Sequence, residues 1–182
     1  MITFKDEVSK KEDYQIKNEF DEIFELFDEG LLPEDKEQDL VEILRKLKSK
    51  AKYNDDDAFN PIRKMYEVTI ESLFANTYNK NKTQDIIHRE LFNDQYELLN
   101  IWGAHNYLSG KTVNLRGSDE SISARNKPVW PGFIEDLSIL ILSISQRNSH
   151  KTDPINHYGY NSITFALLEL LLWYKNFIKD YK

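Results

Sequence analysis

A run of polar residues at positions 146–150 follows the mainly apolar segment 139–144. Within this run Arg147 and His150 are three residues apart, so in a continuing helix both lie on the same face. An Arg side chain offers a planar fork of donors to a phosphate, and a His side chain, which titrates near pH ~6.5, can accept or donate a proton. With Asn148 in support, these residue types and this spacing predict catalysis of proton transfer at a phosphate.

This chemistry selects RNA as the substrate, because the nucleophile is the neighbouring 2′-hydroxyl, which DNA lacks. It needs no metal ion. The net charge of −7 argues against a protein that coats nucleic acid without specificity, because such binding depends on clustered Lys and Arg. Any contact with RNA is therefore expected to be local.

Three more residues are candidates for substrate binding. Trp102 could stack on a base, with His105 in the second wall of the same nucleotide pocket. His157 is an alternative partner for Arg147 if the loop between them folds back. Ordinary structural roles stay open beside these: Trp102 as a core residue at a helix end, and 146–150 as a solvated helix C-terminus whose cations complement the helix dipole.

Several other chemistries are excluded or find no motif. The chain has no Cys, so thiol nucleophiles, thiolate zinc sites and disulfides are ruled out. The four His, at positions 88, 105, 150 and 157, show no close metal-ligand spacing, and no phosphate-binding Gly loop or calcium loop is present. We therefore expect neither a metal nor a cofactor.

The elements that must position these residues are helices. Apolar residues recur at helical spacing, and no segment shows the alternation typical of a strand. The 182 residues, 40% of them hydrophobic, are enough for one core, so we expect a single all-α domain over 1–182, a bundle of about six helices. The predicted helices cover about 16–31, 33–48, 60–74, 83–104 with a bend near 93–94, 131–150 and 162–181.

The helices divide into an N-terminal pair over 14–52 and a larger bundle over 57–181. Gly, Pro and Ser gather in 106–131 without helical periodicity, which predicts a long and functional loop. The segment 1–11 has no apolar stretch of the kind found in signal peptides. The most apolar run, 165–178, is shorter than the ~20 residues that span a bilayer. We therefore expect a cytoplasmic protein that does not contact the membrane.

The C-terminal half resembles the HEPN superfamily. The similarity lies in an apolar helix that ends in Arg147 and Asn148 with a His nearby, followed by a loop and a long apolar helix. It covers roughly 57–181, and the stretch 60–67 is also similar to helices of abortive-infection relatives. In the family four to six residues separate Arg from His, whereas here two separate Arg147 from His150 and nine separate it from His157.

The resemblance implies a dimeric helical bundle with metal-independent endoribonuclease activity, with Arg147 and His150 as catalytic residues. Such proteins act in toxin–antitoxin, abortive-infection or CRISPR-linked antiviral defence, so an antitoxin or another defence protein is an expected partner. The dimer would bury apolar residues of 133–144 and 163–178. Two alternatives remain: a non-catalytic helical module that regulates a defence or toxin partner, and a small-nucleotide sensor with 106–131 as its lid.

Overall fold

The computed structural model describes residues 4–49, 59–78, 81–115, 119–123, 128–149 and 157–181. Within these ranges the chain is predominantly helical, which confirms the all-α prediction, although eight α-helices replace the expected six. The elements in order are α1 (Phe4–Glu19), α2 (Asp21–Asp28), η1 (Glu34–Lys36), α3 (Glu37–Lys48), α4 (Asn60–Thr77), α5 (Lys82–Leu91), α6 (Ile101–Leu108), β1 (Thr112–Asn114), β2 (Ser121–Ser123), α7 (Gly132–Ser149) and α8 (His157–Tyr181).

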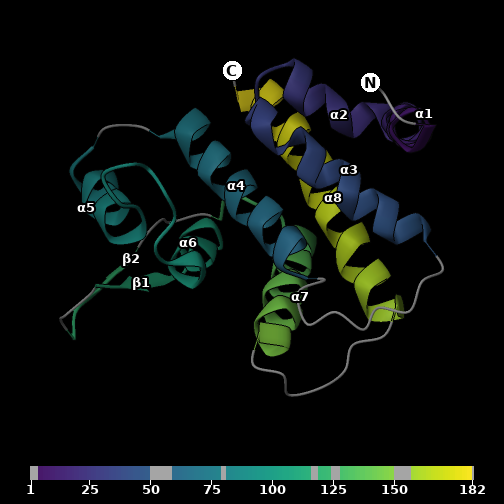
Figure 1. Ribbon diagram of the computed structural model, residues 1–182. Helices are drawn as coiled ribbons and strands as arrows, with labels where there is room; N and C mark the ends of the chain where they lie inside the picture. The colour runs from purple at the N-terminus through teal and green to yellow at the C-terminus, as the bar shows by residue number, and fades with distance from the viewer. Residues whose placement is uncertain are drawn as a thin grey trace.

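Helix α8 is the central element of the bundle. It packs against α2, α3, α4 and α7, and Figure 1 shows it between these helices. Its apolar side chains recur every three or four residues, so one broad stripe faces the core. The buried members of this stripe are Tyr160, Ile163, Ala166, Leu167, Leu170, Leu171, Tyr174 and Ile178. The sequence predicted this stripe, but the helix begins five residues before the predicted start.

The N-terminal segment forms two helices where the sequence predicted one. The chain breaks at Phe20 between α1 and α2, because φ −119° and ψ 31° at this residue leave the helical region. Helix α2 buries one full face and ends at Asp28, two residues before Gly30, whose φ of +66° favours glycine. The predicted end of this segment near Gly30 is therefore confirmed.

Helix α1 is held differently from the rest of the bundle. Among its described side chains only Ile16 is buried. Its other attachments to α3 are ion pairs: Lys17 with Glu37 at 2.7 Å, and three more that join Glu12 and Asp13 to Arg45 and Glu19 to Lys48. Helix α1 therefore docks through one buried apolar side chain and several ion pairs.

The single helix predicted over 83–104 is wrong, because the chain breaks between α5 and α6. Phe92 is extended, with φ −126° and ψ 153°, and the Asn93 side chain accepts hydrogen bonds from the backbone N–H groups of Gln95 and Glu97. This local bonding satisfies the backbone outside a helix. The break falls at the predicted bend, and Asn100 then caps α6 by accepting from the Gly103 N–H at 2.8 Å.

The segment predicted as a loop without strands contains a small antiparallel sheet. Strands β1 and β2 pair with Val113 opposite Ile122, and they lie beside α5 and α6 on one side of the molecule (Figure 1). Three residues per strand are too few for alternation to be visible in the sequence. Val113 is buried, so one side of the pair adds to the core. Within the described ranges, no helix combines the length and apolar character that a membrane span needs.

Candidate functional site

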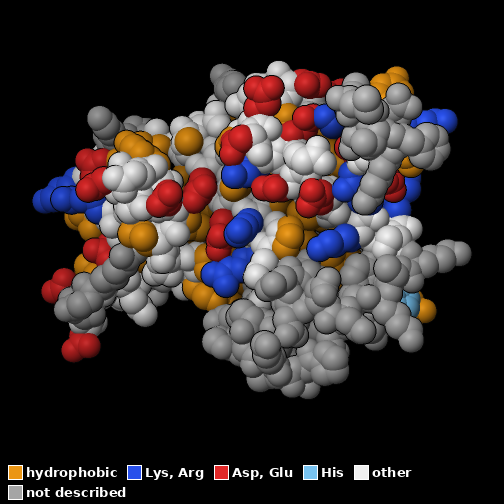
Figure 2. All heavy atoms as spheres, in the orientation of Figure 1, with side chains coloured by type: hydrophobic (Ala, Val, Ile, Leu, Met, Phe, Trp, Pro, Cys, Tyr) orange, Lys and Arg blue, Asp and Glu red, His pale blue; other side chains and the backbone are white. Residues whose placement is uncertain are grey.

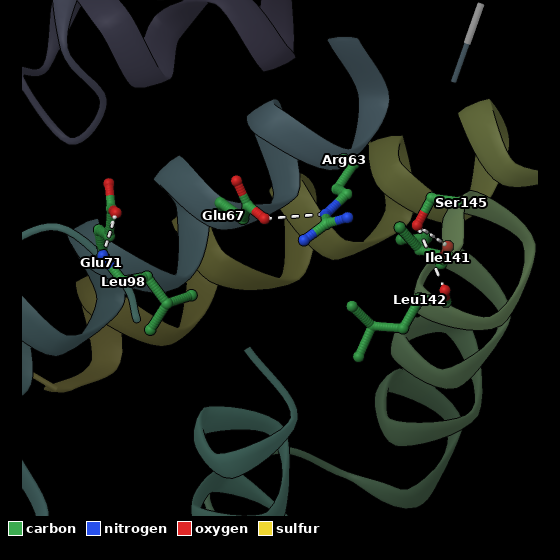
Figure 3. Close-up of polar contacts among 7 residues, drawn as sticks. All are labelled: Arg63, Glu67, Glu71, Leu98, Ile141, Leu142 and Ser145. Atoms are coloured by element: carbon green, nitrogen blue, oxygen red, sulfur yellow. Dashed lines mark hydrogen bonds and ion pairs between the residues drawn. The ribbon is translucent and has the colours of Figure 1, made fainter. Parts of the chain in front are cut away.

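A cavity of about 120 Å³ lies where α4, α6 and α7 meet. Its walls are Arg63 from α4, Ile101 and Trp102 from the first turn of α6, and Leu142 and Ser145 from α7. The cap at Asn100 fixes the start of α6, and therefore fixes where Ile101 and Trp102 enter the wall. Figure 3 shows the α4 and α7 residues from the side, with the Arg63 guanidinium between Glu67 and the α7 wall.

The polar groups of the cavity are an arginine and a hydroxyl. Arg63 donates from Nε to Glu67 Oε1 at 3.0 Å, an ion pair between residues four apart on one helix, so this pair does not use the terminal guanidinium nitrogens. Ser145 donates to the Ile141 carbonyl at 2.7 Å, which leaves its oxygen as an acceptor. The cavity thus combines apolar walls with a few placed polar groups, as small-molecule sites generally do.

Acidic side chains continue along α4 beyond this pair. Glu71 accepts the Leu98 N–H at 2.7 Å and ties α4 to the segment before α6. Burial raises the pKa of Glu71, and the neighbouring Glu67 and Glu97 add to the rise. Figure 2 shows acidic and basic side chains interspersed across the face that carries α3 and α4. Arg63 is therefore one of several cations on a face of mixed charge.

A buried hydrogen-bonded chain lies behind Trp102. His105 is 2% exposed, and its Nδ1 is 2.9 Å from Ser138 Oγ, which is also 2.6 Å from the Tyr66 hydroxyl. On the other side of the ring, Nε2 is 3.5 Å from Ser109 Oγ. These hydrogen bonds join α4, α6 and α7 through polar side chains that are buried in the core.

Burial lowers the pKa of His105 to about 4, and nearby Lys111 lowers it further, while Glu135 opposes both effects. The imidazole is therefore neutral at pH 7. Its ring meets the Trp102 ring edge-on, with centroids 5.7 Å apart. His105 and Trp102, which the sequence placed together, are thus adjacent, but only Trp102 lines the cavity. His105 does not line the cavity but packs against the buried side of the Trp102 indole.

The predicted catalytic residues lie at the end of α7, which remains helical through Ser149. The side chains of Arg147 and Asn148 and the whole of His150 are outside the described part of the chain. At about 100° per residue, the helix places the backbone of Arg147 roughly opposite the side that carries Leu142 and Ser145. The convergence of Arg147 with a His therefore stays a prediction.

His157 is the first residue of α8 and is exposed, with its ring 3.8 Å from the Tyr158 ring. Its distance to the Arg147 side chain is likewise outside what the structure describes. Among the described residues, no group of three or more His, Asp or Glu side chains is arranged to hold a metal ion.

The sequence indicated Trp102 but missed Arg63, Leu142 and Ser145 as walls of a site. One signal was present: Arg63 and Glu67 are four residues apart, which is the spacing of an ion pair on a helix. Nothing in the sequence places α4 beside the end of α7, so the cavity itself was not predictable. Comparison with protein families, curated proteins and solved structures finds no match to this chain.

Proposed function

We propose that this protein binds RNA and cleaves it without a metal ion, with Arg147 and His150 as catalytic residues and Asn148 in support. The observation that carries the proposal is the course of α7. This helix supplies Ser145 to a cavity lined by Trp102, and the polar run begins at the next residue and forms the last turn of the helix. An RNA strand with a base at Trp102 would pass around the end of α7 to the opposite side, where Arg147 is proposed to act.

The proposed reaction is an internal transfer. The 2′-oxygen forms a bond to phosphorus, the bond from phosphorus to the 5′-oxygen breaks, and the products carry a 2′,3′-cyclic phosphate and a 5′-hydroxyl. His150 accepts the proton of the 2′-hydroxyl, and a proton returns to the departing 5′-oxygen. Arg147 stabilises the negative charge that develops on the phosphate oxygens.

The setting of this activity is proposed from the HEPN resemblance: a cytoplasmic toxin or antiviral defence protein that works as a homodimer, with an antitoxin or defence protein as partner. The described helices bury most of the apolar stripe of α8 within one chain. Phe133 on α7 and Phe165 on α8 remain more than half exposed, at 58% and 55%. These two rings are the apolar surface on which a dimer contact is proposed.

A second candidate is a non-catalytic helical module that regulates a defence or toxin partner. The net charge of −7 favours this candidate, because binding of phosphate backbones depends on clustered Lys and Arg. In this case the polar run at the end of α7 only caps the helix.

RNA cleavage by the full chain, with and without a chelator, tests the proposal. We expect cleavage that is indifferent to chelator, and a loss of about 10²–10⁴-fold in His150→Ala, because general acid–base catalysis is worth that much. Arg147→Ala should lose a comparable factor. The matched control is Arg125→Ala, because Arg125 is also followed by an Asn but lies in another part of the chain.

Three outcomes would change the proposed roles of Arg147 and His150. Loss in His157→Ala instead of His150→Ala would assign the proton transfer to the other His. Equal loss in Arg125→Ala and Arg147→Ala would remove the special role of the α7 end. Absence of cleavage by the wild type on varied RNAs would favour the interaction module.

A further inference from the structure

We infer that the cavity between α4, α6 and α7 binds a single pyrimidine base, which makes the protein selective for pyrimidine over purine nucleotides. This inference rests on the proposed RNA function and specifies which part of the RNA the cavity holds. It draws on the size of the cavity, on the polar groups at its wall and on the support of Trp102.

The volume of the cavity sets the size of its ligand. Cavities of about 150 Å³ with apolar walls hold benzene, and this one measures about 120 Å³ and opens to the surface. One six-membered ring therefore fits with its substituents toward the opening. A purine has a second fused ring, which we expect to remain outside a cavity of this volume.

The charges at the wall favour a neutral ring with both an acceptor and a donor on its edge. Arg63 and Glu67 neutralise each other, so neither an anionic nor a cationic ring gains a net attraction. The terminal nitrogens of Arg63 can donate to a ring carbonyl, as guanidinium groups do to base edges. The Ser145 oxygen can accept from a ring N–H or amino group. Uracil and cytosine carry both kinds of group on a single ring. Guanine carries them too, so the size of the cavity is what separates pyrimidines from purines.

Trp102 supplies the flat surface on which such a ring stacks. The indole is 36% exposed, and the buried His105 meets it edge-on from behind. The helix start that carries it is closely packed: a Cβ added at Gly103 would lie 2.6 Å from Asn100 Nδ2 and 2.7 Å from Leu91 Cδ2. The stacking platform is therefore fixed before a ligand arrives, which lowers the entropy cost of binding.

Calorimetric titration of the full chain with cytidine, uridine, adenosine and guanosine 3′-monophosphates tests the inference, with Trp fluorescence as a second readout. We expect both pyrimidine nucleotides to bind at least about tenfold more tightly than both purine nucleotides, and to quench Trp102. Leu142→Phe fills the cavity and should weaken pyrimidine binding about tenfold or more. Arg63→Met keeps the length of the side chain but removes its donors, and should also weaken binding.

Lys64→Met is the matched control. Lys64 follows Arg63 on α4, is exposed and does not line the cavity, so its loss should leave the affinity unchanged. Circular dichroism checks that each variant is folded. If Leu142→Phe fails to fold, Arg63→Met still tests the inference, because its side chain is half-exposed and its replacement leaves the core intact.

The inference is overturned by equal affinity for purines and pyrimidines, by no binding of any nucleotide at millimolar concentration, or by equal losses in Lys64→Met and Arg63→Met. Its failure is separable from that of the proposed function. Cleavage that depends on Arg147 and His150 but shows no pyrimidine binding defeats only the cavity assignment. Pyrimidine binding without any RNA cleavage defeats only the catalytic proposal.

Discussion

Lowering the pH from 7 to 5 should destabilise this protein through one side chain, His105. The ring is 2% exposed and hydrogen-bonded to Ser138, and desolvation is the largest cause of its lowered pKa. Folding therefore favours the neutral imidazole. The resulting stability is fully present above the unfolded-state pKa and is lost as the pH falls toward the folded-state pKa.

The magnitude follows from the two pKa values. The folded pKa is about 4, and an unfolded His titrates near ~6.5, a difference of about 2.5 units or roughly 3 kcal/mol. At pH 5 the unfolded chain binds most of one proton at this site, while the folded chain binds almost none. The free energy of unfolding should then be lower by about 2 kcal/mol at pH 5 than at pH 7 from this group alone.

Urea unfolding of the wild type and of His105→Asn at both pH values isolates this contribution. The Asn amide can still bond Ser138 but does not titrate, so the wild type should lose about 2 kcal/mol more than the variant between pH 7 and pH 5. Other groups, including the half-buried His88, titrate equally in both proteins and cancel. In the control His157→Asn, an exposed His is replaced, and the pH dependence should match that of the wild type.

Identical pH dependence in the wild type and His105→Asn would contradict this expectation, because it would mean that the ring gains water or a counter-charge on protonation. An equally large effect in His157→Asn would show that burial is not the cause.

Two further substitutions have defined outcomes in thermal or urea unfolding. Gly103→Ala should lower the free energy of unfolding by about 1–3 kcal/mol, because the new Cβ overlaps the Asn100 side chain that caps α6. Gly132→Ala is the control and should lower it little, because a Cβ at Gly132 has nothing within 4 Å. Equal effects of the two substitutions would contradict this prediction. Ser138→Ala should cost about 2–4 kcal/mol, because two buried side chains lose a shared partner, while Ser143→Ala serves as its control.

Most of the helical fold was predictable because periodicity is a local property of the sequence. The stripe of α8 and the end of α2 just before Gly30 both follow from residues within a few positions of each other. The break between α5 and α6 was only partly predictable. It depends on the side chain of Asn93 bonding the backbone of its neighbours, which competes with a helix that the apolar spacing also allows.

The candidate site was less predictable, because it is made by helices distant in sequence. Trp102 was recognisable from its type and neighbours, but Arg63 and Leu142 share a wall only because α4 and α7 pack together. The fully buried position of His105 was also not evident. A His beside a Trp suggests a pocket, while the partner that keeps it in the core, Ser138, is 33 residues away.

Helix α1 is attached less firmly than the other helices of the bundle. Lifting α1 away exposes one buried described side chain, Ile16, worth about 1.5–3 kcal/mol, and breaks ion pairs that each contribute about 0–1 kcal/mol in water. The amides of α1 therefore exchange with solvent through local opening, many times for each global unfolding event that exposes α8. Since added salt screens such pairs, it should make the opening of α1 more frequent and leave the apolar core of the bundle largely unaffected.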